Sequence, residues 1–178
     1  MLGNLFGVHE FLPHTEILGI VGEVLCGDES IIQPLCSNAL FAVCGFNRKQ
    51  MNDTLIPVIM GHTPAGASTQ QILHYGQEIK SRRFRQWDYG SIGNLRKYGS
   101  LSPPKYKLKN IKAPVYLHYS RNDWLSHERD VDQLAKELGN LAGKFLSIDK
   151  KFNHVDYLFG IDARDQLYNR VIGLMKRH

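Results

Sequence analysis

The sequence predicts an α/β fold in which a mostly helical region is followed by the last part of a parallel sheet. The chain has 178 residues, of which 43% are hydrophobic, so it is long enough to form one domain with a core. Apolar segments interrupted by glycine dominate its first part, whereas short β-branched runs alternate with helical patterns after about residue 110. We therefore expect a helical region at residues 1–110 and a sheet-containing region at residues 111–178.

Residues 11–46 are rich in Leu, Ile, Val and Gly, with a polar break at residues 27–30. This pattern is typical of two or three short apolar helices that fold back on each other. Such helices form either a buried core or a lid whose apolar face covers a site and meets lipid when it opens. Both interpretations stand at this point.

A helix is expected at residues 69–83, with Ser68 as its N-cap and Gln71 as the capping-box partner three residues on. Several glycines and the pair Pro103-Pro104 follow this helix. We therefore expect residues 89–112 to be mostly loop.

The pattern changes period at residues 114–119, a β-branched and aromatic run that predicts a buried strand ending in a turn. Apolar residues at i, i+3, i+4 and i+7 from Val131 then predict a helix that stops at Gly139-Asn140. A second strand is expected at residues 144–150, a loop at residues 152–154 and a final helix at residues 166–175. This order is that of the end of an α/β-hydrolase sheet.

The composition argues against several classes of function. The formal net charge is +5, and the densest basic run, Lys80 to Arg85, lacks a nucleic-acid-binding motif and is typical of a solvated helix end. We expect no targeting segment at the N-terminus and no membrane-spanning helix, because no apolar run reaches about 18 residues. The three cysteines permit one disulfide and one free thiol, and the histidines lack metal-ligand spacing. Neither a metal nor a cofactor is expected.

Asp123 and His154 carry the chemistry that the sequence suggests. Each follows a predicted parallel strand, and functional residues of such sheets lie on the loops at the carboxyl ends of the strands. The 31 residues between them leave room for one helix and one strand, which puts their loops side by side. A histidine next to a buried carboxylate is the base of a catalytic triad, and serine, acid and then histidine is the α/β-hydrolase order. Taken alone, Asp123 is more simply explained as the cap of a turn and His154 as a histidine in a loop. Taken together, the two residues favour a catalytic triad.

These residues also resemble a known family. The segments around them, NDWL at residues 122–125 and FNHVDY at residues 152–157, resemble the acid and histidine motifs of the acid lipase family, which includes gastric, lysosomal and insect digestive lipases. Residues 35–41 and 61–70 resemble that family's cap, so the likeness covers nearly the whole chain. The resemblance implies that residues 1–110 are a cap or lid and residues 111–178 the C-terminal part of the core.

The resemblance further implies that Asp123 is the triad acid, His154 the triad base, and Cys26 and Cys36 the cap disulfide, with Cys44 free. Two departures concern the acid loop: Arg121 replaces a small residue, and residues 126–128 replace an Ala-Asp-Pro-like turn. The triplet at Asn52 is a glycosylation sequon, which supports an extracellular or lysosomal protein.

The family's nucleophile lies in a Gly-x-Ser-x-Gly elbow, and this pattern does not occur in the 178 residues. At Ser68 the second glycine of an elbow is replaced by Gln70, so Ser68 is interpreted as a helix cap. The prediction is a lipase that hydrolyses triacylglycerols or cholesteryl esters at a lipid–water interface, represented here without its nucleophile. The alternatives are a non-catalytic lipase fragment that binds lipid or a partner chain, possibly the missing N-terminal half, and an esterase or peptidase on the same fold.

Overall fold

The computed structural model of the chain describes residues 10–13, 20, 24, 26, 31, 36, 41–63 and 65–178. The apolar helices expected at residues 11–46 thus lie largely outside the described residues, apart from a helical stretch at 41–44. The chain divides into two compact units, which are described separately. The first unit comprises Met1–Glu16 and His62–Lys107, and the second comprises Ile17–Gly61 and Leu108–His178.

In its described residues, the first unit contains a small antiparallel sheet and two helices. Its elements are β1 (Glu10–Phe11), β2 (Ala67–Ser68), α5 (Thr69–Ser81) and α6 (Gly90–Tyr98), with β1 paired to β2. The predicted cap of α5 is confirmed, because Ser68 Oγ accepts a hydrogen bond of 3.2 Å from the backbone amide of Gln70. The helix ends two residues earlier than expected, where Arg82 adopts the left-handed conformation with φ 53°.

The expectation that residues 89–112 are mostly loop is wrong, since α6 and a 3-10 turn at Leu108–Asn110 lie within this segment. Gly90 and Gly99 mark the ends of the helix, and Gly99 caps it with φ 69°. Asn94 is buried inside α6 and donates hydrogen bonds to Asp88 and to the carbonyl of Leu101. Such tertiary contacts outweigh the weak helix propensity of this sequence.

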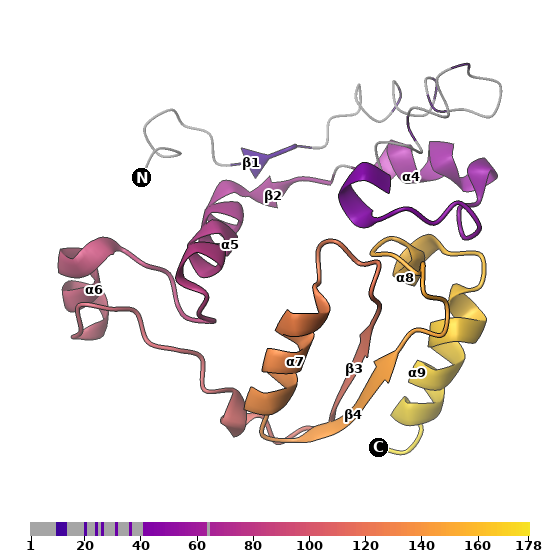
Figure 1. Ribbon diagram of the computed structural model, residues 1–178. Coiled ribbons are helices and arrows are strands. Elements are labelled where there is room, and N and C mark those ends of the chain that lie inside the picture. Colours follow the sequence, from indigo (N-terminus) through magenta and orange to yellow (C-terminus); the bar gives the residue numbers. More distant parts are fainter. Residues whose placement is uncertain are drawn as a thin grey trace. The chain divides into compact units, whose positions relative to one another are not determined.

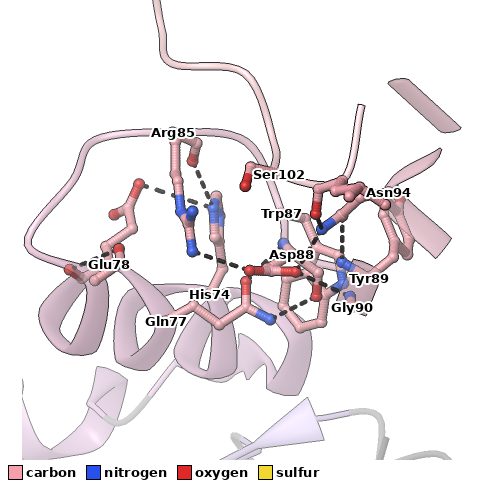
Figure 2. A network of polar contacts seen from close by, with 12 residues as sticks. His74, Gln77, Glu78, Arg85, Trp87, Asp88, Tyr89, Gly90, Asn94 and Ser102 are labelled. Carbon is pink, nitrogen blue, oxygen red and sulfur yellow. Dashed lines mark hydrogen bonds and ion pairs between the residues drawn. The ribbon is translucent and has the colours of Figure 1, made fainter. Parts of the chain in front are cut away.

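A network of polar contacts joins α5 to the segment that leads into α6 (Figure 2). His74 Nε2 lies 2.9 Å from the carbonyl oxygen of Arg85, and Gln77 exchanges hydrogen bonds of 2.9 and 2.8 Å with the backbone of Asp88. The hydrogen bond from Asn94 and that from the amide of Gly90 lower the pKa of the Asp88 carboxyl. The side of α5 that faces this segment is therefore polar.

The second unit holds the predicted parallel strands. Its elements are η1 (Asp53–Leu55), α4 (Ile56–His62), β3 (Val115–Tyr119), α7 (Glu128–Glu137), β4 (Leu141–Leu146), α8 (Asp156–Phe159), a π-helical turn η3 (Arg164–Tyr168) and α9 (Asn169–Met175). The parallel pairing of β3 with β4 runs from Val115 opposite Leu141 to Tyr119 opposite Leu146.

The second strand begins three residues earlier than the expected position 144. The chain enters β4 directly after the helix stop at Asn140, whose carbonyl oxygen accepts a hydrogen bond of 2.9 Å from the amide of Val115. The strand β3 was expected to be buried, but each of its residues is only half-buried. The final helix is confirmed as α9, which the π-helical turn precedes.

The two-stranded sheet lies between α7 and α9 (Figure 1). On one face His118 packs against Phe145, and the guanidinium of Arg170 in α9 lies 4.9 Å from the centre of the Phe145 ring. On the other face Lys144 pairs with Asp132 of α7. The order strand, helix, strand, loop and helix thus brings the loops after β3 and β4 to one edge of the sheet.

Candidate active site

Asp123 and His154 meet at the carboxyl edge of the sheet. Asp123 follows the end of β3 by four residues, and His154 lies on the loop after β4. Nδ1 of His154 lies 3.0 Å from Oδ2 and 3.2 Å from Oδ1 of Asp123. The structure therefore brings together the two residues that the sequence pairs.

The carboxylate of Asp123 is held by its own loop. Its Oδ1 accepts hydrogen bonds of 2.9 Å from the backbone amides of Leu125 and Ser126. The residue is only 7% exposed, so the carboxylate lies in a setting where an ion pair or hydrogen bond is poorly screened by water. These contacts fix Asp123 in the orientation that faces the imidazole.

His154 combines a fixed nitrogen with an accessible one. Its side chain is 47% exposed, although Nδ1 is engaged by Asp123. A proton on Nδ1 leaves the lone pair on Nε2, at the far side of the ring, as the basic atom. The backbone amide of His154 donates a 3.2 Å hydrogen bond to the carbonyl oxygen of Cys44. The arrangement can accept a proton from a nucleophile that approaches Nε2.

The residues next to His154 form a reciprocal cap. Asn153 is fully buried, and its Oδ1 accepts hydrogen bonds of 3.0 Å from the amides of Val155 and Asp156. In return, Oδ2 of Asp156 accepts a 2.8 Å hydrogen bond from the amide of Asn153. This exchange over three residues is the geometry of a capping box. It locks the backbone on both sides of His154.

A segment far away in the sequence, residues 44–50, holds the histidine loop from outside. Asn153 Nδ2 donates to the carbonyl oxygen of Gly45 at 2.7 Å, and Asn47 Nδ2 donates to Oδ2 of Asp156 at 2.7 Å. Asn122, the residue before Asp123, donates to the carbonyl oxygens of Phe46 and Lys151 at 3.0 and 2.6 Å. Residues 44–50 thus connect the acid loop to the histidine loop.

The same loops contain buried titratable groups. Burial raises the pKa of the Asp156 carboxyl to about 6, and the nearby Asp149 acts in the same direction against the hydrogen bonds from Asn153 and Asn47. Burial, followed by the negative charges of Asp123 and Asp156, raises the pKa of the Cys44 thiol. Cys44 is therefore kept in its neutral form, which is a poor nucleophile.

The two departures from the family pattern lie together in the structure. Arg121 Nε lies 3.4 Å from Oε2 of Glu128, so the two replaced positions form a partly exposed ion pair across the acid loop. His127 takes the role of helix cap, since its Nδ1 accepts a 3.1 Å hydrogen bond from the amide of Arg129 at the start of α7. The start of α7 is therefore capped by a side chain although residues 126–128 depart from the family pattern.

Apolar side chains border the pair. Trp124 is 55% exposed and Phe46 is 52% exposed, and their rings lie edge to face with centroids 5.8 Å apart. Leu125 is also exposed. Because Trp124 follows Asp123 directly and Phe46 belongs to residues 44–50, this apolar rim lies beside the acid and histidine loops.

The other predicted site residues have separate places. Cys26 and Cys36 form a disulfide, and Cys44 is free and buried. Asn52 caps the turn at Asp53–Leu55 through Oδ1, whereas a glycan would be attached to its Nδ2. Ser68 serves as the cap of α5 in the first unit. Within the described ranges, no group of three or more His, Cys, Asp or Glu side chains could hold a metal ion.

Sequence reasoning missed the residues that hold the histidine loop. The spacing of Asn153 and Asp156 is that of a capping box, so this signal was present in the sequence. The roles of Gly45 and Asn47 have no comparable signal, because their partners lie more than 100 residues away.

Comparison with known proteins shows relatives along nearly the whole chain. The chain is 38% identical to Lipase 3 of Drosophila melanogaster over 172 residues, which are 97% of this chain and 44% of that protein. It is 35% identical to human lysosomal acid lipase/cholesteryl ester hydrolase over 179 aligned positions, covering 100% of this chain and 44% of that protein. It is 36% identical to bovine gastric triacylglycerol lipase, over 96% of this chain and 43% of that protein. No protein-family model matches the chain.

The chain spans less than half the length of the curated relatives that it matches. Among the described residues, no helix is long and apolar enough to cross a membrane. The resemblance first suggested by the acid and histidine motifs is confirmed by 35–38% identity in alignments that cover nearly the whole chain. Along nearly its whole length, this chain is a homologue of the lipases that include lysosomal acid lipase, gastric lipase and insect lipases.

Proposed function

We propose that this chain supplies the acid and the base of a carboxylic ester hydrolase of the acid lipase type. The observation that carries this proposal is the hydrogen bond between Nδ1 of His154 and the buried carboxylate of Asp123. This pair fits hydrolysis through an acyl-enzyme, in which a serine attacks the ester carbonyl. The serine and the oxyanion hole would come from outside these 178 residues, which contain no Gly-x-Ser-x-Gly elbow.

In this mechanism His154 accepts the serine proton at Nε2 and later donates it to the leaving alcohol. Asp123 stays ionised, keeps the Nδ1 proton in place and stabilises the imidazolium that forms. The amides of Leu125 and Ser126 keep the carboxylate aligned during this cycle. The capping box and residues 44–50 limit the movement of the imidazole, because they fix the backbone on either side of it.

The apolar rim supports an apolar ester as substrate. Trp124 and Phe46 expose rings beside the acid and histidine loops, and such surfaces lose water favourably when an acyl chain covers them. Relatives of the chain are named for the hydrolysis of triacylglycerols and cholesteryl esters. We infer that the substrate is one of these lipid esters, presented at a lipid–water interface.

The disulfide and the sequon support an oxidising compartment. Disulfides persist in secreted and luminal proteins, and the bond between Cys26 and Cys36 closes a short loop. We propose that Asn52 carries a glycan and that the protein is extracellular or lysosomal, in agreement with the names of its lysosomal and gastric relatives. We also assign residues 1–110 to a cap or lid and residues 111–178 to the C-terminal part of the hydrolase core.

The test joins this chain to the N-terminal half of the Drosophila Lipase 3 relative, which would supply the nucleophile and oxyanion hole. The joined protein should hydrolyse a long-chain triacylglycerol emulsion, and His154→Ala should reduce the rate by several orders of magnitude. The matched control is His62→Ala, which removes an exposed histidine at the end of α4. A joined protein that folds and binds lipid but keeps its rate in His154→Ala would contradict the proposed role.

A further inference from the structure

The helix α5 has its polar side turned inward and its apolar side turned outward. His74 lies one turn before Gln77 and Glu78. All three are on the side of α5 that contacts the segment from Arg85 to Asp88, as Figure 2 shows. A helix on the surface of a globular domain normally buries its apolar stripe and exposes its charges. In α5 this order is reversed, and no residue of the helix is fully buried.

The outward side of α5 carries an apolar stripe, defined here by Ile72, Leu73 and Ile79. Ile72 and Leu73 are each 42% exposed, and Ile79 is 63% exposed. Gly76 lies between the two isoleucines on the same side, and a Cβ placed there would meet nothing within 4 Å. Among the residues that the structure describes, the stripe is therefore open along two helical turns, and it has a flat centre.

Basic side chains stand at the end of this stripe. Lys80, Arg82 and Arg83 are exposed at the C-terminal end of α5, whereas Arg85 is paired with Asp88 at 2.9 Å. Residues 62–107 hold eight Lys and Arg against two Asp and Glu, an excess of six positive charges. The net charge of the whole chain is +5, so this segment accounts for all of it. Lys80 thus lies in the last turn of α5, and Arg82 and Arg83 follow directly after the helix.

We propose that the apolar stripe of α5 and the basic residues Lys80 and Arg83 form a docking surface for an anionic lipid–water interface. A helix of this kind lies in the plane of the interface, with its apolar side inserted among the acyl chains and its cations at the head groups. The charge of the segment selects an anionic surface over a neutral one. This surface deepens the proposed lipase function, since it names how the chain meets its substrate, but it requires no turnover.

Vesicle flotation with the whole 178-residue chain tests the proposal, because bound protein rises with the vesicles while aggregated protein sinks. The chain should float with vesicles of equal parts phosphatidylcholine and phosphatidylglycerol, and much less with phosphatidylcholine alone. Raising the salt concentration should weaken the binding, as screening predicts. Lys80→Gln combined with Arg83→Gln should weaken it about 30-fold, the effect of removing two cations near an anionic surface.

The stripe is tested separately from the charges. Ile72→Ser combined with Ile79→Ser should reduce binding to the anionic vesicles by about ten-fold or more, because two inserted apolar side chains are lost. The matched controls lie in the second unit: Ile148→Ser with Ile161→Ser, which are 80% and 58% exposed, and Lys109→Gln with Lys112→Gln, which are exposed. Both control pairs should float as the original chain does.

Three results would overturn the proposal. The first is a folded chain that does not float with the anionic vesicles. The second is a loss of binding in the control pairs as large as that in the α5 pairs. The third is self-association of the chain that the two isoleucine substitutions abolish, without flotation, which would assign the stripe to a contact between copies. None of these measurements depends on ester hydrolysis, so they are independent of the outcome for His154.

Discussion

The side-chain nitrogen of Asn47 donates a hydrogen bond of 2.7 Å to Oδ2 of Asp156, across 109 residues of sequence. Asp156 in turn accepts from the amide of Asn153, next to His154. The position of the candidate catalytic histidine therefore depends on a segment that lies outside the strand, helix and strand of the core. The first three predictions below concern this dependence.

Replacing Asn153 by alanine should reduce the free energy of unfolding by about 2–3 kcal/mol. The change removes a helix cap and leaves the buried carbonyl oxygen of Gly45 without its donor. Asn140→Ala is the matched control, because its Nδ2 also donates to a backbone carbonyl at 2.7 Å but is exposed. The control should lose no more than about 1 kcal/mol in urea unfolding. Equal losses in the two variants would show that burial at Asn153 contributes nothing.

Gly45→Ala should destabilise the second unit by at least about 2 kcal/mol. Gly45 has φ +103°, and an added Cβ would lie 2.1 Å from the backbone oxygen of Asn122, so the acid loop would have to move. Gly173→Ala in α9 meets nothing within 4 Å and should gain about 0.5–1 kcal/mol. The proton resonance of His154 Nδ1–H, observed by NMR, should change in the Gly45 variant alone. An unchanged resonance in the Gly45 variant would show that residues 44–50 do not position the catalytic pair.

The contribution of Asp156 to the free energy of unfolding should increase as the pH falls from about 6 to about 4. Its pKa is raised to about 6 in the folded chain from an unfolded value of 3.8, so the folded state binds the extra proton in this range. The contribution is at most about 3 kcal/mol for a shift of two pKa units. In Asp156→Asn this part of the pH dependence should vanish, which urea unfolding at pH 4, 5, 6 and 7 measures. Parallel stability curves for the two proteins would contradict the raised pKa.

Short-range patterns predicted the part of the fold that carries Asp123 and His154. The strand at residues 115–119, the helix from Glu128 and the final helix each follow from local periodicity and from their turn residues. The acid and histidine loops could be paired because a parallel strand connection fixes which edge they share.

The remaining features depend on contacts that local patterns do not contain. The helix α6 was missed because its glycines resemble a loop, while the buried amide of Asn94 stabilises it through hydrogen bonds with Asp88, Tyr89 and Leu101. The role of residues 44–50 was missed because the partners of Asn47 and Gln50 lie more than 100 residues away. The reversed sides of α5 could not be seen either, since periodicity identifies a stripe but not the side that faces the protein.

The most direct test of the central claim is the rate of triacylglycerol hydrolysis by Asp123→Asn in the joined protein described above. The asparagine can keep its oxygen on the amides of Leu125 and Ser126, but its NH₂ group would face Nδ1 of His154 and require the wrong tautomer. The account predicts a fall in kcat of about 10⁴-fold, with KM and the unfolding transition nearly unchanged. A rate within ten-fold of the original protein would contradict the assignment of Asp123 and His154 as acid and base.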